Sequence, residues 1–136
     1  MTENIAITWR RIPERYRLAG TQCMNCHTKF FPPRKLCPDC RRKGKIESCA
    51  FAGKGKIFSY SEVHSAPAGL ELEIPYVLAI VQLEEGPKLT AQLVDCLEKD
   101  VKIGDAVEVV FRRIRSDDPE GLLHYGYKFR LVGERK

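Results

Sequence analysis

The sequence predicts a mostly β chain with short N-terminal helices, a small metal-binding lobe and a five-stranded β-barrel. Three observations lead to this fold class. Apolar residues near the N-terminus recur at helical spacing, four cysteines form two Cys-x-x-Cys pairs, and the remainder alternates as strands with no helical period between them. We therefore place a helical arm in residues 1–20, the metal lobe in 21–52 and the barrel in 53–136.

The composition is that of an ordinary globular chain. With 136 residues, 43% hydrophobic and 30% charged, the chain is neither disordered nor collagen-like. No apolar run approaches the roughly 20 residues that a membrane-spanning helix needs. Residues 1–6 also lack the basic and then apolar order of a signal peptide. We therefore expect a cytoplasmic protein with no membrane partner.

The first segment predicts a short amphipathic arm. Its apolar residues at helical spacing are Ile5, Trp9, Ile12 and Tyr16. Pro13 interrupts the run, so we expect two short helices or one kinked helix, with Pro13 opening the second half. Such an arm either packs on its own metal lobe or presents anchors to a partner protein, because Trp and Arg are favoured at interfaces. The candidate partner-binding residues are Trp9, Arg10, Arg11 and Tyr16.

Two Cys-x-x-Cys pairs give the strongest signal in the chain. They are Cys23 with Cys26 and Cys37 with Cys40, and ten residues separate the pairs. Two such turns can aim four thiolates at one point, which makes a closed cage with metal–sulfur distances of about 2.3 Å. Two disulfides are the alternative, but a reducing cytosol disfavours them. We expect one zinc ion; iron also suits a thiolate cage but is less favoured.

This metal is expected to be structural. A lobe of this size buries too little apolar surface to fold alone, and four thiolates leave no open coordination position. His27 follows the first pair, where knuckle turns often need a positive φ, so we interpret it as a turn residue and not as a ligand. The spacer 27–36 is expected to form a hairpin, with residues 30–33 at its turn.

Five strand-like segments follow the metal lobe. They are residues 56–64, 76–83, 88–94, 106–111 and 122–131. A long, bent first strand followed by short, mostly antiparallel strands predicts an oligonucleotide/oligosaccharide-binding (OB) barrel. Because OB barrels bind ligands of several classes, the fold alone does not give the function.

Positive charge is concentrated in the first part of the chain. Residues 1–56 hold 13 Lys/Arg and 4 Asp/Glu, a balance of +9, whereas residues 57–136 hold 10 and 14, a balance of −4. The basic part favours an anionic partner, although a solvated basic face is the simpler alternative. The candidate phosphate contacts are Arg34, Lys35, Arg41 and Arg42. A nucleic-acid-binding module would need exposed aromatic residues on the barrel, and the acidic barrel opposes a polyanion.

No catalytic constellation emerges from the sequence. Neither His64 nor His124 accompanies a nucleophile in a recognisable context, and there is no glycine-rich phosphate loop. Cys49 and Cys96 are interpreted as inert thiols. A further hypothesis is that one of them carries an acyl group. We therefore expect that this chain does not act as an enzyme on its own.

Several segments, taken in order, resemble a known family. They are YRLAGTQC (16–23), FPPR (31–34), CPDC (37–40), GKGKIFSYS (53–61), PYVLAIVQL (75–83) and VKIGDAVEVVF (101–111). Together they are similar to the prokaryotic zinc-ribbon/OB-fold family associated with acyl-CoA metabolism, over nearly the whole chain. One departure is His27, where family members often have glycine.

The resemblance implies N-terminal helices, a rubredoxin-like zinc ribbon and a C-terminal OB fold. It also implies a non-catalytic scaffold subunit that binds thiolase-like enzymes and helps to hold or pass acyl-CoA in lipid, isoprenoid-precursor or polyketide metabolism. In archaeal members the partners are acetoacetyl-CoA thiolase and hydroxymethylglutaryl-CoA synthase. A nucleic-acid-binding zinc-ribbon/OB module is the alternative function.

Overall fold

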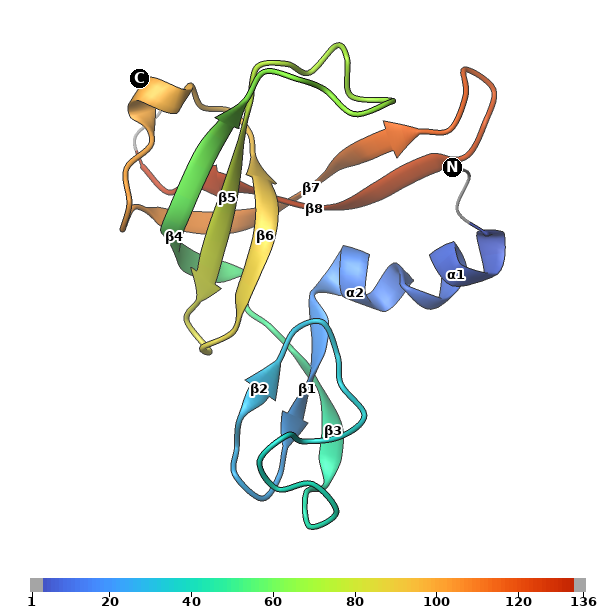
Figure 1. The fold of residues 1–136 in the computed structure, drawn as a ribbon, viewed down its shortest axis with the longest axis vertical. Helices are drawn as coiled ribbons and strands as arrows, with labels where there is room; N and C mark the ends of the chain where they lie inside the picture. The colour runs from blue at the N-terminus through green and yellow to red at the C-terminus, as the bar shows by residue number, and fades with distance from the viewer. Residues whose placement is uncertain (1–3, 134–136) are drawn as a thin grey trace.

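The computed structural model describes residues 4–133, which form an arm, a ribbon and a barrel (Figure 1). Helices α1 (Ile5–Arg10) and α2 (Ile12–Arg17) precede the ribbon strands β1 (Ala19–Cys23), β2 (Lys29–Phe30) and β3 (Ile46–Ala50). The barrel strands are β4 (Lys54–Val63), β5 (Tyr76–Leu83), β6 (Lys88–Leu93), β7 (Ala106–Ser116) and β8 (Leu123–Leu131), with a 3₁₀ helix, η1 (Glu98–Asp100), between β6 and β7. Within residues 4–133, neither α-helix has the length and apolar content to cross a bilayer.

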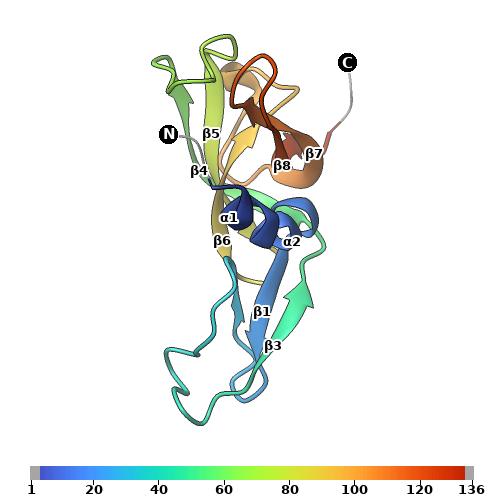
Figure 2. The same cartoon turned by 90° about the vertical axis from the view of Figure 1, so that its right-hand side faces the viewer.

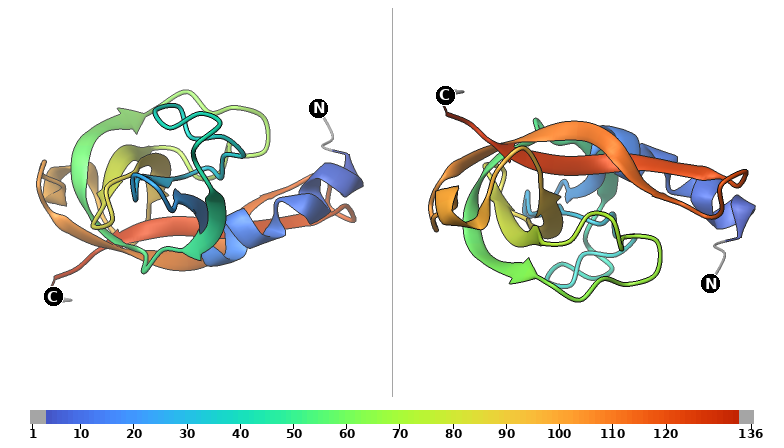
Figure 3. Two further views of the ribbon diagram at one scale, coloured as in Figure 1. Left: turned by 90° about the horizontal axis from the view of Figure 1, so that it is seen from below. Right: turned by 90° about the horizontal axis from the view of Figure 1, so that it is seen from above.

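The arm consists of two short helices, as predicted. The side chain of Asn4 caps α1 by accepting the N–H of Ala6 at 2.9 Å, and Pro13 lies in the first turn of α2. Helices of six residues are not stable alone, so the arm depends on tertiary packing. It lies along the β7–β8 hairpin of the barrel (Figure 3), and α2 also adjoins β1, the ribbon strand that follows it.

The barrel is closed, with strand order β4-β5-β6-β8-β7, and it confirms the predicted OB fold. Its pairs are antiparallel except β6 with β8, which is parallel. Strand β5 shows how the core is specified, because Val77, Ala79, Val81 and Leu83 point inward and alternate with more exposed residues. The ring of Phe129, which is fully buried, lies in the same core.

The β7–β8 hairpin is longer than the sequence predicted. Pairing continues past the expected end at Phe111 to Ser116 opposite Leu123, across an irregularity between Arg113 and Arg115. The prediction stopped early because consecutive arginines after Phe111 break the alternation of apolar and polar residues. This extension projects from the barrel and forms the platform for the arm (Figures 1 and 3).

The expected hairpin within the spacer 27–36 is wrong. Strand β2 pairs with β1, with Phe30 opposite Thr21, so the first Cys-x-x-Cys turn is itself the hairpin turn. Residues 30–33 do not form the turn; they lead the chain away from the sheet. The physical reason is that Pro32 and Pro33 have no N–H with which to continue the ladder.

The ribbon meets the barrel where β1 begins and where β3 ends (Figure 2). Leu18 and Phe51, which flank these strands, belong to the same buried cluster as the barrel core. The ring of Phe31 lies edge-on to Phe51 and to Tyr127, with centroids 6.0 and 5.6 Å away. The ribbon therefore rests on the barrel through aromatic packing as well as through the chain connection.

Candidate functional site

The two cysteine turns have the same backbone geometry. The carbonyls of Cys23 and Cys37 each accept an N–H four residues later, from His27 and Arg41, at 2.8 Å in both cases. His27 and Arg41 have positive φ angles of 62° and 49°. The interpretation of His27 as a turn residue is confirmed, because its backbone closes the first knuckle and the ring is not part of the cysteine group.

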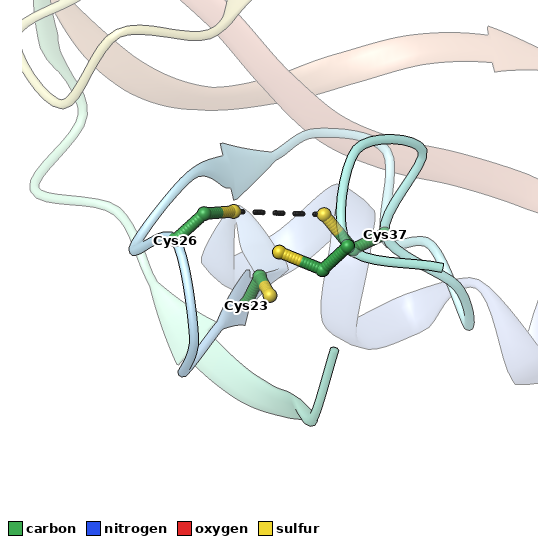
Figure 4. A group of neighbouring side chains, drawn as sticks. Cys23, Cys26 and Cys37 are labelled. Carbon is green, nitrogen blue, oxygen red and sulfur yellow. Dashed lines mark hydrogen bonds between the residues drawn. The ribbon is translucent and has the colours of Figure 1, made fainter. Parts of the chain in front are cut away.

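The sulfur atoms of four cysteines converge between these turns, and Figure 4 labels three of these residues, Cys23, Cys26 and Cys37. The Sγ atoms of Cys23, Cys26, Cys37 and Cys40 all lie within 4.8 Å of one another, and those of Cys26 and Cys37 are 3.6 Å apart. A tetrahedron with metal–sulfur bonds of about 2.3 Å has edges of about 3.8 Å, so this spacing fits a metal. All four cysteines are free, and 3.6 Å is far longer than a disulfide bond of about 2.05 Å.

The electrostatics of the four sulfurs also fit a cation. The hydroxyl and N–H of Thr28 lower the pKa of Cys26 to about 6. Asn25 lowers the pKa of Cys40, yet burial and the three neighbouring thiols together raise it to about 11. Four such close thiolates need a positive ion between them. Four protein ligands leave no position for water or substrate, so the metal that this site would hold is structural.

Asn25 is expected to support the metal from outside the cage. Its Nδ2 lies 3.0 Å from Cys40 Sγ and donates a hydrogen bond to it. Asn25→Ala is expected to weaken metal binding about 10- to 100-fold, as loss of such supporting contacts does in other sites. Competition against a chromophoric chelator measures this change. Met24→Ala alters the same turn without touching a sulfur contact and should leave affinity unchanged; equal losses in both variants would refute the role of Asn25.

The four basic candidates lie on the surface of the ribbon. Arg34, Lys35, Arg41 and Arg42 are all exposed. The guanidinium of Arg34 lies 5.4 Å from the centre of the Phe30 ring, and its backbone N–H donates to Thr21 Oγ1 at 2.9 Å. Arg41 also closes the second knuckle through its backbone. These side chains remain candidates for phosphate contacts.

The predicted apolar face of the arm lines a groove against β8. All four residues at helical spacing contribute to it: Ile5, Trp9, Ile12 and Tyr16. The opposite wall comes from the hairpin, with Leu122, Leu123 and Tyr125, and the cavity volume is about 230 Å³. Trp9 nevertheless remains 74% exposed, and Arg10 and Arg11 are exposed beside it. We call this cavity the arm groove.

The sequence did not predict that the β7–β8 hairpin forms one wall of the arm groove. The ring of Phe111 is half exposed and lies 4.9 Å from the ring of Tyr16, edge-on, while it stacks on Tyr125 at 5.4 Å. Leu122 and Leu123 are 44% and 50% exposed. The adjacent leucines after a polar turn could have indicated an exposed apolar surface, but the sequence analysis interpreted them only as the start of a strand. The arm–hairpin surface comprises the arm groove and Phe111.

The aromatic residues of the barrel do not form a platform for bases. Phe129 is fully buried, and Tyr60 and Tyr127 pack against the core. Tyr125 stacks on Phe111 under the arm. Phe58 is 50% exposed, but the ammonium of Lys88 lies 3.6 Å from its ring centre. This arrangement gives little support to the nucleic-acid alternative, which needs several exposed rings in series.

Two further cysteines lie outside the cage. Burial raises the pKa of Cys49. Burial also raises the pKa of Cys96, and the nearby carboxylates of Asp100 and Asp95 raise it further. Because the thiolate is the reactive form, a raised pKa opposes an acyl-carrier role.

Two family descriptions match the chain in the order that the structure shows. Residues 10–46 match the rubredoxin-like zinc ribbon domain of ChsH2, and residues 50–112 match the C-terminal OB-fold domain of ChsH2. The first match contains all four cage cysteines, and the second covers β4 to β6 and much of β7. The chain therefore consists of a zinc ribbon followed by an OB fold.

Similar proteins agree with this assignment. A DUF35 domain-containing scaffold protein of Methanocaldococcus jannaschii is 53% identical over 92% of this chain and 89% of its own length. The benzoylsuccinyl-CoA thiolase subunit BbsA of Geobacter metallireducens is 29% identical over 85% of this chain and 75% of its own. A chain of the solved Ltp2-ChsH2(DUF35) aldolase has a TM-score of 0.70 and 30% identity, with 96% of each chain covered. The chain belongs to the ChsH2/DUF35 family of zinc-ribbon and OB-fold proteins.

Proposed function

We propose that this chain is a non-catalytic scaffold subunit that binds a thiolase-like enzyme through the arm–hairpin surface. The observation that carries the proposal is the exposure of Trp9, 74%, at the edge of an apolar groove and beside Arg10 and Arg11. Monomeric proteins rarely leave a large apolar residue exposed beside other exposed apolar side chains, and Trp and Arg are common anchors of interfaces. The metal cage, which is closed, contributes rigidity and no chemistry.

The relatives support a role in an assembly. Three of them are named scaffold proteins, another is named a thiolase subunit, and the solved structure pairs a ChsH2 chain with Ltp2 in an aldolase. A subunit of an enzyme need not carry the reaction. In this chain the functional features of the described residues are a closed cage and an apolar surface, which suit binding better than catalysis.

The same proposal extends to a ligand and a second partner. A CoA ester joins a phosphorylated nucleotide to an apolar acyl tail, so the exposed cations Arg34, Lys35, Arg41 and Arg42 would contact its phosphates while partner enzymes hold the acyl part. A hydroxymethylglutaryl-CoA synthase-like enzyme is the second proposed partner. The proposed location is the cytoplasm, where these enzymes and a reduced thiolate cage coexist.

Co-purification with the thiolase-like enzyme of the same organism tests this function. We expect a stable complex with the wild-type chain and at least a tenfold weaker affinity for Trp9→Ala, measured by calorimetry. Leu36→Ala is the matched control, because Leu36 is also apolar and 58% exposed but lies on the ribbon. A chain that remains monomeric when it is mixed with the enzyme would refute the proposal. Equal losses of affinity in Trp9→Ala and Leu36→Ala would refute it as well.

A further inference from the structure

Strand β6 has one edge that the other strands of the barrel leave largely uncovered. On one side it pairs with β5 along its whole length, from Lys88 opposite Gln82 to Leu93 opposite Val77 (Figure 1). On the other side, within residues 4–133, its pairing with β8 is confined to Leu93 beside Phe129. The part of β6 that precedes Leu93 therefore has an open edge.

The register shows which backbone groups face this open edge. The N–H of Leu83 donates to the carbonyl of Pro87 at 2.9 Å, so the pair that closes the β5–β6 hairpin is a hydrogen-bonded pair. Such pairs alternate with non-hydrogen-bonded ones along an antiparallel ladder, so Leu89 is also bonded to β5. Lys88 and Thr90 lie on either side of it, and they direct their N–H and C=O groups toward the open edge.

A cavity of about 490 Å³ lies along the same edge. Leu89, which points into the barrel core, and Thr90, which is exposed, both line it, so the cavity borders the edge between the two faces of β6. Its other walls include Phe31 and Pro32 of the ribbon and Tyr127 of β8. A largely apolar cavity therefore adjoins backbone donors and acceptors that no strand pairs with.

Lys88 does not protect this edge, although a charged side chain is a common protection of edge strands. Its ammonium lies 3.6 Å from the centre of the Phe58 ring on β4, so the side chain extends across β5 and away from the open edge. Among the described residues it forms no ion pair, and no other residue that lines the cavity is charged. A carboxylate opposite Lys88 on an added strand would supply the missing charge.

We propose that the open edge of β6 binds an extended segment of a partner protein as an added antiparallel strand. This segment carries an acidic residue opposite Lys88, an apolar residue opposite Leu89 and a β-branched residue opposite Thr90. Side chains of directly opposite residues lie on the same face, so the apolar residue enters the cavity while the acidic residue stays outside. The inference goes beyond the proposed function, because this cavity and the arm groove share no residue.

A blocked peptide of sequence STVES tests the proposal on the full chain with its metal bound. In the proposed pairing, the N–H groups of its threonine and glutamate face β6, whereas the valine N–H faces away. N-methylation of the glutamate removes the donor to the Lys88 carbonyl and is expected to weaken binding about tenfold. N-methylation of the valine is the matched control and should change the affinity by less than about twofold. An NMR titration measures all of these affinities.

The charge of the segment is tested with the peptide STVKS. It places a lysine opposite Lys88, and like charges directly opposite each other destabilise a strand pair. We expect it to bind about fivefold more weakly than STVES. Equal affinities of STVES and STVKS would remove the acidic residue from the proposal and overturn it in this form.

A variant of the chain provides a second measurement. Thr90→Pro removes the N–H that faces the open edge but no hydrogen bond to β5, which is the position where an edge strand tolerates proline. We expect it to bind STVES about tenfold more weakly, and Thr90→Val, which keeps the N–H, to bind as the wild type does. If Thr90→Pro fails to fold, hydrogen exchange of the wild-type chain decides. The amides of Lys88 and Thr90 should gain protection with STVES, and that of Leu89 should not change.

Three results would overturn the inference. They are an absence of binding at millimolar STVES, equal losses of affinity from the two N-methylations, and unchanged exchange of the Thr90 amide in the presence of the peptide. None of them concerns the arm–hairpin surface. The comparison of Trp9→Ala with Leu36→Ala in the enzyme complex therefore still tests the proposed function separately.

Discussion

Cys37→Ser is expected to abolish metal retention and to unfold the ribbon. The side chain of Cys37 is fully buried, and its Sγ lies 3.6 Å from that of Cys26, so a serine leaves three thiolates and a poor fourth ligand. Binding of a structural zinc supplies about 10–16 kcal/mol of folding free energy in small zinc domains. Elemental analysis should give one zinc ion per wild-type chain and less than a tenth of that in the variant.

Hydrogen exchange shows where the loss of metal acts. Amides of β1, β2 and β3 should lose protection in Cys37→Ser and in wild-type chain treated with a strong chelator. The barrel strands should keep most of theirs, although the melting temperature falls because Leu18 and Phe51 connect the two cores. Cys96→Ser, outside the cage, should retain its zinc. A Cys37→Ser variant with one zinc ion and a protected ribbon would contradict the structural role of the cage.

Gly53→Ala is expected to destabilise the junction between ribbon and barrel by more than about 3 kcal/mol. Gly53 has φ of +76°, a conformation that costs a residue with a Cβ about 1 kcal/mol or more. A Cβ at this position would also lie 2.2 Å from Val109 Cγ1, while the Gly53 carbonyl accepts the Val109 N–H at 2.7 Å. The backbone therefore cannot move away without losing that hydrogen bond.

A second glycine separates the two contributions. Gly104 has φ of +94°, but a Cβ there would meet nothing within 4 Å, so Gly104→Ala carries the conformational cost alone. We expect Gly104→Ala to lose about 1–2 kcal/mol and Gly53→Ala clearly more, measured by urea unfolding. Adding Val109→Ala to Gly53→Ala should recover part of the loss. Equal losses of unfolding free energy in Gly53→Ala and Gly104→Ala would show that the contact with Val109 is unimportant.

Local patterns account for most of the correct predictions. The spacing of Cys23, Cys26, Cys37 and Cys40 predicts the cage because each turn needs only four consecutive residues. The alternation in residues 76–83 predicts β5 for the same reason. Pro13 similarly marks the break between the two helices.

Features that join distant segments were not predictable from these patterns. Nothing near Trp9 in the sequence indicates that the arm lies against Leu122 and Leu123, and the pairing of His124 with Asp117 depends on how the hairpin folds. The division of charge at Lys56 likewise describes the order of residues along the chain and not their arrangement in space. In the structure, the arm lies along the β7–β8 hairpin (Figure 3), and β7 contains Arg112 and Arg113.

Hydrogen exchange on the complex with the thiolase-like enzyme determines whether the arm–hairpin surface meets the partner. Both arm helices have only six residues, so we expect their amides to exchange rapidly in the free chain and to gain strong protection on contact with an enzyme. We expect new protection in residues 5–17 and 111–125 on binding. An arm that exchanges equally fast in the free and bound chains, with protection gained only elsewhere, would contradict it.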